Sequence, residues 1–520
     1  MDTQNWKSQL FFGDNIFKLK DLYSEYPKGF IDLIYIDPPF NSKRNYNVLF
    51  ESLDLSDSTA QKEAFADTWS NISYIDTLSE IADLNIHLYK FLKNLEDIGI
   101  PLSAVAYLTT MAIRIWYMNK LLKETGSFYL HCDSTMSHYL KIICDLIFGE
   151  RNFKNDIVWV RSTSVGSSKA IAKRFPTLND DILFYTKSDN YTFNKFYLPP
   201  SEQYKARFNN KDQYGSFYWN TLATYSEKTY EKLEKEGKVR WTEGAKFPQY
   251  KTYLHELKGN VIPSVWSDID MLNPMAAERL GYPTQKPEEL LDRIIKASSN
   301  ENDLIADFFC GCGTTIAVAE KLNRKWLGVD ISHLAVRLIA NRIGKENINK
   351  TFEIHGFPKD LASAKELANN VKGGRLEFEE WVVEFLLQGI LNEQRNTMGF
   401  DGYRTFDANG KKCLVMIEVK SGGVTMAQFN HFIKTVSDKK GDIGIFVSFE
   451  DQITKNMKVA AKKEGNFEIN GNTFCDKIQI STIEDLLDNR FPHIPESTKE
   501  TFKKAVKKTT SNNDHPKLDL

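Results

Sequence analysis

The stretch between residues 303 and 330 constrains the fold of this chain more than any other. We expect a strand at Asp303–Ala306, then a glycine-containing loop, a helix that runs to Lys321, and a second strand at Lys325–Val329. A strand–helix–strand order of this kind implies a doubly wound α/β sheet. An earlier apolar run, Ile31–Ile36, fits a central parallel strand that is buried on both faces. The sequence therefore predicts an α/β fold.

The glycine loop that follows the first of these strands has the features of a ligand-binding turn. It reads Asp307-Phe-Phe-Cys-Gly-Cys-Gly-Thr-Thr315. Glycines let the backbone approach a ligand closely, and the N–H groups at the start of the next helix suit a carboxylate. Asp330 closes the next strand and can accept both hydroxyls of a ribose. The loop could hold any nucleotide, and a cofactor without phosphates fits as well. For Asp330 the alternative is a helix N-cap.

The run Ile31–Ile36 ends in the tetrapeptide Asp37-Pro38-Pro39-Phe40. Sheets of this class carry their ligands at the carboxyl ends of strands. Two hydrogen-bond acceptors at such a strand end would suit an amino group that has to attack a methyl donor, such as the exocyclic amine of adenine. That nitrogen is a poor nucleophile because its lone pair is delocalised into the ring. The Asp37 carboxylate and the Pro38 carbonyl could accept its two N–H bonds and stabilise the positive charge that develops on nitrogen. Phe40 offers a flat face to a base extruded from a duplex. The structural alternative is a rigid turn at the end of a strand.

Residues 8–340 resemble the β class of N6-adenine and N4-cytosine DNA methyltransferases. In that class the catalytic loop comes first, a target-recognition region follows and the cofactor loop comes last, as in this chain. The matching segments are Gly13-Asp14, Asp37–Asn41, Thr125–Asp133, Phe148–Ile157 and Tyr282–Leu290, which runs into Asp307–Thr315. The run Pro283-Thr-Gln-Lys-Pro287 before the glycine loop is highly specific for this class.

The resemblance implies S-adenosylmethionine as cofactor and double-stranded DNA as substrate. The implied cofactor-binding residues are Asp307, Phe308, Cys310, Gly311, Gly313, Thr314 and Asp330, with Thr284, Gln285 and Lys286 near the methionine end. Asp14 and Asn41 are implied to lie at the target base. This chain departs from the family at Phe309 and Cys310, where Pro-Phe-Ala or similar is usual. An aspartate at the head of the tetrapeptide favours adenine N6, because cytosine-N4 members usually begin with serine. Methylation of cytosine N4 is the alternative.

A second group of charged residues lies nearer the C-terminus. Asp401 comes before the apolar strand Cys413–Lys420, which carries Glu418 and Lys420. Adjacent strands could bring both carboxylates to one Mg²⁺, and Lys420 could orient water or stabilise a leaving phosphate. The arrangement resembles the PD-(D/E)XK restriction-endonuclease-like fold, closest to its Mrr-like branch. This implies Asp401, Glu418 and Lys420 as cleavage residues; the alternative is a module that only binds DNA or mediates dimerisation.

These features divide the chain of 520 residues into six parts. Regular alternation gives way to polar and aromatic residues from about 155 to 270, which suggests a recognition region, with a structural insertion as the alternative. The expected parts are the catalytic half of a Rossmann-like methyltransferase domain (1–150), its target-recognition region (151–275), its cofactor-binding half (276–345), a linker (346–374), a smaller α/β restriction-endonuclease-like domain (375–490) and a disordered basic tail (491–520).

We therefore expect a site-specific adenine-N6 DNA methyltransferase of a restriction–modification system, with a fused Mg²⁺-dependent nuclease. A methyltransferase that acts on glutamine amides is a rival interpretation, but that class usually carries Asn-Pro-Pro-Tyr and has the cofactor loop first. The aspartate and the order of the two segments in this chain both speak against it. A non-enzymatic DNA-binding protein and a pure nuclease both conflict with the intact methyl-transfer residues. The net charge of −2 neither supports nor excludes DNA. Scattered cysteines and the lack of an apolar run near 18 residues favour a reduced, cytoplasmic protein away from membranes. The resemblance also suggests a possible homodimer.

Overall fold

The computed structural model describes most of the chain, including both predicted sites. The described residues are 6–39, 74–162, 173, 175–195, 197–257, 259–273, 275–280, 282, 284–346, 352–370, 374–392, 394–408, 411–469 and 472–495. Two predicted site residues, Phe40 and Asn41, lie outside them, as does the predicted basic tail from residue 496 onward. The chain forms two compact units, one of residues 193–266 and one of the remainder.

The larger unit contains a mixed sheet in which strands run in the order β4-β5-β3-β2-β13-β14-β1-β15. The pairs from β3 to β15 are parallel, whereas β5 pairs antiparallel with both β3 and β4. This confirms the predicted α/β fold. The strand bounds are β1 Gln9–Phe12, β2 Ile31–Ile36, β3 Leu122–Cys132, β4 Phe153–Val160, β5 Asn179–Thr186, β13 Leu304–Asp307, β14 Lys325–Asp330 and β15 Glu353–His355.

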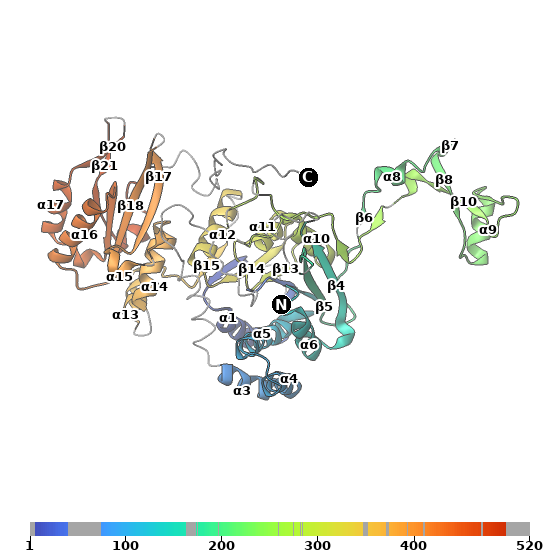
Figure 1. The fold of residues 1–520 in the computed structure, drawn as a ribbon, viewed down its shortest axis with the longest axis horizontal. Coiled ribbons are helices and arrows are strands. Elements are labelled where there is room, and N and C mark those ends of the chain that lie inside the picture. The colour runs from blue at the N-terminus through green and yellow to red at the C-terminus, as the bar shows by residue number, and fades with distance from the viewer. Residues whose placement is uncertain are drawn as a thin grey trace, which may run out of the picture. The chain divides into compact units, whose positions relative to one another are not determined.

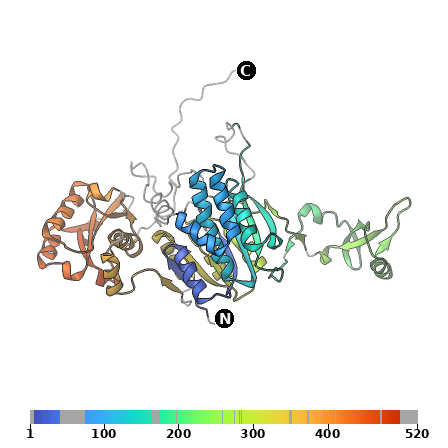
Figure 2. The same ribbon diagram turned by 90° about the horizontal axis from the view of Figure 1, so that it is seen from below.

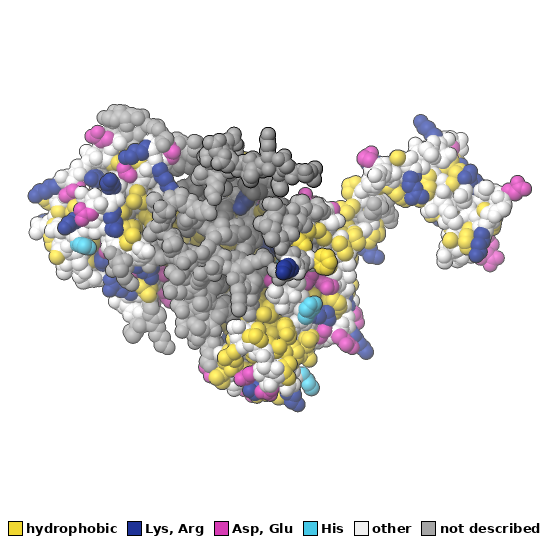
Figure 3. Space-filling view, in the orientation of Figure 1, with side chains coloured by type: hydrophobic (Ala, Val, Ile, Leu, Met, Phe, Trp, Pro, Cys, Tyr) yellow, Lys and Arg dark blue, Asp and Glu magenta, His cyan; other side chains and the backbone are white. Residues whose placement is uncertain are grey.

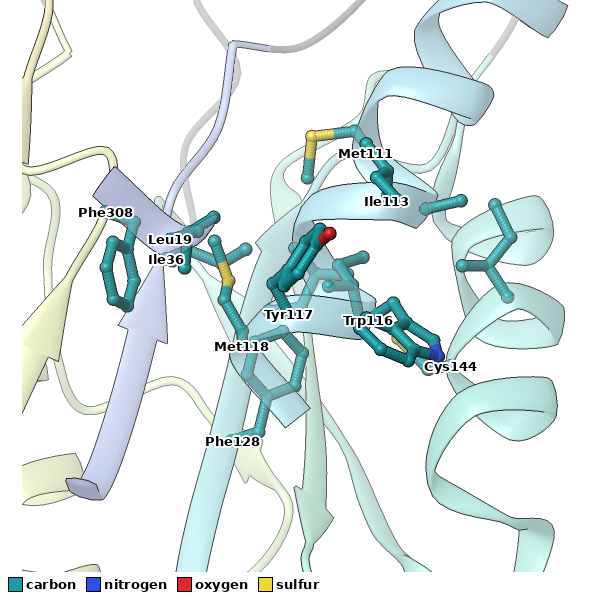
Figure 4. Close-up of a cluster of buried hydrophobic side chains, with 14 of the residues drawn as sticks. Leu19, Ile36, Met111, Ile113, Trp116, Tyr117, Met118, Phe128, Cys144 and Phe308 are labelled. Carbon is teal, nitrogen blue, oxygen red and sulfur yellow. The ribbon is translucent and has the colours of Figure 1, made fainter. Parts of the chain in front are cut away.

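Helices cover both faces of this sheet (Figures 1 and 2). On one face, α5 is buried on nearly all sides because α1, α3, α4 and α6 pack around it. Apolar side chains such as Leu19 of α1 and Ile36 of β2 meet there in the core (Figure 4). The helices on this face are α1 Asn15–Glu25, α3 Tyr74–Leu84, α4 Ile86–Asp97, α5 Leu102–Leu121 and α6 Ser137–Phe148. On the other face lie α10 Glu288–Ser298, α11 Thr314–Lys321 and α12 His333–Glu346.

Two stretches contain elements of this sheet where other roles were expected. Strands β4 and β5 belong to it, although they lie within the range 151–275 assigned to target recognition. The range 346–374, expected to be a linker, contains β15, which pairs with β1, and the helix α13 (Leu361–Asn369). A capping box begins α13, because the Asp360 side chain accepts from the backbone of Ser363 and the Ser363 side chain accepts in return. Short edge strands and helices of this kind leave little periodicity in the sequence.

The unit of residues 193–266 holds a small antiparallel sheet in the order β7-β8-β10-β9. Cation–aromatic contacts tie its strands together: the Arg240 guanidinium lies 4.0 Å from the centre of the Trp219 ring, and Lys251 Nζ lies 4.8 Å from that of Phe217. The elements are β6 Tyr197–Leu198, α8 Glu202–Lys205, β7 Asn210–Asp212, β8 Gly215–Thr221, α9 Glu227–Lys235, β9 Val239–Arg240, β10 Gln249–Tyr253, a 3₁₀ turn Leu254–Glu256, β11 Asn260–Val261 and β12 Val265–Trp266.

The C-terminal part contains a five-stranded sheet in the order β16-β17-β18-β19-β22. Strands β16, β17 and β18 pair antiparallel, and β18, β19 and β22 pair parallel. Separate apolar clusters line its two faces, one with α16 and α17 and the other with α14 and α18. The bounds are α14 Gly374–Glu380, a π-helical turn Trp381–Leu386, β16 Ile390–Leu391, α15 Arg395–Met398, β17 Gly402–Ala408, β18 Lys411–Lys420, α16 Met426–Asp438, β19 Ile443–Ser448, α17 Lys455–Lys463, β20 Asn466–Ile469, β21 Asn472–Asp476, β22 Ile478–Thr482 and α18 Ile483–Leu487.

Apolar side chains are exposed below the large sheet, over α3, α4 and α6 (Figure 3). The exposed residues there include Ile75, Ile86, Ile98 and Ile142. Scattered exposed apolar residues are ordinary on a protein surface, so this finding alone assigns no partner. In the part of the chain that the structure describes, no helix combines the length and the apolar character needed to cross a membrane.

Candidate functional site

The glycine loop connects the carboxyl end of β13 to the start of α11 and lies beside the carboxyl end of β14. Gly311 and Gly313 adopt positive φ angles of 49° and 76°. A Cβ atom on Gly313 would lie 2.4 Å from a side-chain carbon of Ile339, so only glycine fits at that position unless the Ile339 side chain moves. The Gly311 N–H donates to Asp330 Oδ2 at 2.7 Å, and the Ser332 N–H donates to Oδ1 at 2.9 Å. Asp330 thus caps the next turn and faces the glycine loop at once.

Two buried carboxyl groups lie at this loop. Burial raises the pKa of Asp330 to about 6, although backbone N–H groups act to lower it. Burial also raises the pKa of Asp307 to about 7, against hydrogen bonds from the Thr315 hydroxyl at 2.6 Å and the Phe309 N–H at 3.0 Å. Asp307 therefore holds the loop in shape through its own hydrogen bonds. Asp330 instead lies at the end of β14, where it contacts the glycine loop that follows β13.

Of the other predicted loop residues, Phe308 and Cys310 are buried. The Phe308 side chain is fully buried and lies in the core near Leu19 and Ile36 (Figure 4). Its carbonyl oxygen accepts a hydrogen bond of 2.6 Å from Asn15 Nδ2. Cys310 is 6% exposed, and burial raises the pKa of its thiol. Phe308 is thus part of the core, and its carbonyl is already bonded to Asn15.

The predicted catalytic aspartate and the predicted methionine-end lysine are in contact. Asp37 follows β2, and its carboxylate forms an ion pair with Lys286 Nζ in which both side chains are largely buried. The Lys286 carbonyl accepts a hydrogen bond of 3.2 Å from the Thr314 hydroxyl, which links this segment to the glycine loop. Gln285 holds its own segment, because its side-chain amide bonds the backbone of Leu280 and Glu278. The ring of Tyr282 lies beneath Gly311.

Asp14 lies at the end of β1, which β13 and β14 separate from β2. Its carboxylate caps α1 by accepting from the Ile16 N–H and forms an ion pair of 2.7 Å with Arg114. Arg114 also donates to the Asn15 side chain at 2.6 Å. Asp14 is thus nearer to Asp330, whose backbone pairs with Gly13, than to Asp37. Arg114 and Asn15 could not be predicted from sequence, because a lone arginine in an apolar helix gives no local signal.

A second site forms in the C-terminal sheet, where the three residues predicted from sequence come together. The backbone N–H of Val419 donates to Asp401 Oδ2 at 2.7 Å, which fixes that carboxylate beside the end of β18. Lys420 Nζ lies 3.6 Å from Asp401 Oδ2 and forms an ion pair with Glu418 Oε1. The other oxygen of Glu418, Oε2, is buried and has no hydrogen-bond partner among the residues that the structure describes. Glu379 of α14 is buried nearby and raises the local negative charge.

Burial and the negative charge of Asp401 raise the pKa of Glu418 to about 7, although Lys420 acts to lower it. An unpartnered carboxylate oxygen beside a second carboxylate suits a divalent cation. Within the described ranges, no three Asp, Glu, His or Cys side chains gather as a complete metal site. Mg²⁺ is commonly held by one or two carboxylates together with water and substrate oxygens, so Asp401 and Glu418 fit that ion.

Comparison with known proteins points to one family. A model of the family described as DNA methylase matches residues 31–341. Type II methyltransferase M.EcaI of Enterobacter cloacae is 29% identical over 266 residues, which cover 46% of this chain and 58% of that protein. The StyLTI Mod subunit of Salmonella typhimurium, a type III restriction–modification enzyme, is 25% identical over 359 residues, or 62% of this chain and 51% of that one. The chain thus spans less than two thirds of the length of both relatives.

Two further matches cover more of the other protein. DNA adenine methyltransferase YhdJ of Escherichia coli is 25% identical over 340 residues, which cover 65% of this chain and 83% of that protein. Among solved structures, the M1.HpyAVI–SAM complex matches 64% of this chain and 98% of its own, with 15% identity and a TM-score of 0.33.

The raised pKa of Glu418 predicts a stabilising substitution. The ionised form is disfavoured in the fold, so the stability that the neutral form provides is lost as pH rises through about 7. Glu418→Gln should therefore raise the free energy of unfolding at pH 8 by roughly 1–3 kcal/mol, and this gain should vanish at pH 4.5. Urea denaturation at both pH values measures the difference. The exposed Glu366→Gln is the matched control, and a Glu418→Gln variant that is less stable than the unsubstituted protein at pH 8 would contradict the prediction.

Proposed function

The chain belongs to the DNA methylase family, and on that premise we propose that it transfers a methyl group from S-adenosylmethionine to the N6 amino group of adenine in double-stranded DNA. The observation that carries the proposal is the meeting of Asp37 with the glycine loop. Parallel pairing of β2, β13 and β14 puts the carboxyl ends of the three strands side by side. Lys286 pairs with Asp37 and Thr314 bonds Lys286, so these two residues link Asp37 to the glycine loop. The matched region, 31–341, contains all of these residues.

The cofactor side of the site suits a nucleoside that carries an amino-acid group. Asp330 can accept hydrogen bonds from two ribose hydroxyls, and Gly311 and Gly313 keep the backbone bare beside it. The N–H groups at the start of α11 suit a carboxylate. S-adenosylmethionine, when bound, supplies the methyl group. Gln285 and Lys286 hold the segment between this loop and Asp37, and the Thr284 carbonyl accepts from Lys286 Nζ at 3.5 Å. Asp14 follows Gly13, whose N–H bonds the Asp330 carbonyl, so it would lie toward the cofactor.

At the acceptor side, Asp37 and the Pro38 carbonyl would bind the two N–H groups of the target amine. These acceptors turn the nitrogen lone pair toward the donor and stabilise the positive charge that develops during transfer. Lys286 balances the charge of Asp37 in a site that is largely closed to water. The aspartate at the head of the tetrapeptide and the relative named as an adenine methyltransferase favour adenine. Transfer to cytosine N4 is the alternative.

We further propose that the C-terminal part is a Mg²⁺-dependent nuclease that acts with the methyltransferase in restriction and modification. The buried, unpartnered Glu418 Oε2 beside Asp401 supports this proposal, as does the relative named as part of a restriction–modification enzyme. Asp401 and Glu418 would hold the ion, and Lys420 would orient the attacking water. The possible homodimer stays a prediction. The alternative for this part is a module that binds DNA without cutting it.

Removal of the Asp37 carboxylate should abolish transfer and spare cofactor binding. Asp37→Ala takes away the acceptor for the target amine but no group at Asp330, so incorporation of labelled methyl into DNA should fall by about 100-fold or more. Binding of S-adenosylmethionine, measured by calorimetry, should change little. Asp83→Ala, an exposed aspartate of α3, is the control. Undiminished transfer by the Asp37 variant would contradict the proposal.

Cofactor affinity should weaken in acid. The ribose hydroxyls bind the ionised form of Asp330, whose pKa is raised to about 6, so protonation below that pH competes with binding. The dissociation constant of S-adenosylmethionine should rise about tenfold between pH 7.5 and pH 5. Asp330→Asn should bind weakly at both values and lose this dependence. A pH-independent constant in the unsubstituted protein would rule out Asp330 as the ribose acceptor.

Cleavage should depend on Mg²⁺ and on Lys420. The protein is incubated with methylated and with unmethylated DNA, with Mg²⁺ or with excess chelator, and strand breaks are counted on gels. Lys420→Ala should lower cleavage by about 100-fold or more, whereas Lys412→Ala, at the other end of the same strand, should cut normally. If neither DNA is cut while methyl transfer is intact, the C-terminal part is not a nuclease.

A further inference from the structure

We propose that Tyr35, His131 and Asp180 form a buried positioning network that holds Asp37 in the geometry needed for methyl transfer. The inference rests on the proposed function and adds three residues to that site. The Tyr35 hydroxyl lies 2.9 Å from His131 Nδ1, and His131 Nε2 lies 3.2 Å from Asp180 Oδ2. The three side chains come from the adjacent strands β2, β3 and β5.

The network adjoins Asp37 on the same face of the sheet. Tyr35 and Asp37 are two positions apart along the strand direction, so their side chains project to the same side. Asp37 is close enough to act on the Tyr35 hydroxyl electrostatically and, after burial, is the largest cause of the raised pKa of Tyr35. An anchored Tyr35 ring therefore fixes the last stretch of backbone before Asp37.

The far end of the network leads back to the same site. Asp180 is 4% exposed, and burial alone would raise its pKa. His131, Arg161 and Lys286 together lower that pKa instead, so Asp180 is a buried carboxylate held in its charged form. Lys286 is the residue that forms the ion pair with Asp37. Asp180 is thus linked through His131 to Tyr35, two residues before Asp37, and acts electrostatically with Lys286, which pairs with Asp37.

Both nitrogens of the His131 ring are used. The charged Asp180 carboxylate can only accept, so Nε2 carries a proton and donates to it, while Nδ1 shares a hydrogen bond with the Tyr35 hydroxyl. The ring is fully buried, and the Trp159 ring stands edge-on to it at 5.7 Å. The Trp159 indole donates to the Ile269 carbonyl at 2.8 Å, so this wall is itself fixed. A buried network with all members bonded is rigid.

A purely structural role would stabilise the sheet without affecting the chemistry, and the chain contains a matched control. Tyr129 pairs directly with Tyr35 in the register of β2 and β3. Both tyrosines are 2% exposed, and the Tyr129 hydroxyl makes one hydrogen bond of 2.7 Å, to Ser298 Oγ. Tyr35→Phe and Tyr129→Phe therefore remove the same atom from equally buried rings, but only the first breaks the network at His131.

The test compares these two variants of the full chain on unmethylated genomic DNA of mixed base composition. We expect Tyr35→Phe to lower kcat about tenfold, with little change in KM for DNA or in calorimetric S-adenosylmethionine binding. Tyr129→Phe should keep the original kcat while both variants lose a similar amount of thermal stability. Equal kcat values in the two variants would overturn the inference. No methyl transfer by the unsubstituted protein would overturn the proposed function, and the inference with it.

A double variant tests whether the residues act as one unit. If Tyr35 acts through His131 and Asp180, then Asp180→Asn should also lower kcat, and the Tyr35→Phe/Asp180→Asn protein should lose little more than the worse single variant. If the fold-losses in kcat of the two single variants multiplied in the double variant, the residues would act independently. That result would refute the inference even if each single variant were slow.

Discussion

The candidate site depends on the position of a single four-residue strand. Strand β13 lies between β2 and β14 and pairs parallel with both, so the ends of the three strands open on one edge of the sheet. Asp37 and Lys286 are 249 positions apart in the chain, and they meet at this edge because the Lys286 segment is bonded to Thr314, at the end of the loop that follows β13. The four residues of β13 are fully buried, so no polar side chain but the terminal Asp307 interrupts the core at that point.

The buried carboxyl groups of both sites share one physical feature. Burial raises the pKa of Asp307, Asp330 and Glu418, which means that the fold disfavours their charged forms. Such groups cost folding stability, which makes Asp330 and Glu418 candidates for a chemical role, whereas Asp307 holds the glycine loop through its own hydrogen bonds. Asp180 shows the opposite solution, because three neighbours keep a carboxylate of similar burial charged.

Much of the frame could be predicted from sequence, because its signals are local. The apolar runs at β2, β13 and β14, together with the rule that ligands bind at carboxyl ends of parallel strands, were enough to bring Asp37 and Asp330 to one edge. The partner of Lys286 could not be predicted, since a contact between distant side chains depends on packing and leaves no periodic pattern. The same holds for the pair of Arg114 with Asp14 and for the hydrogen bond from Tyr35 to His131. The burial of the Phe308 ring could not be predicted for a different reason: residues in a loop do not follow the alternation of buried and exposed side chains that a strand shows.

The order of strands in the sheet has a consequence for synthesis on the ribosome. Strand β2 is made early and pairs with β3, but its other edge has no partner until residues 304–307 have been added. Strand β1 waits longer still, because its two neighbours are β14 and β15. Long-range parallel pairing is slow, and open strand edges invite association with other chains. The growing chain therefore carries two unpaired strands, β1 and β2, through more than half of its elongation. The centre of the large sheet closes only when residues 304–330 emerge.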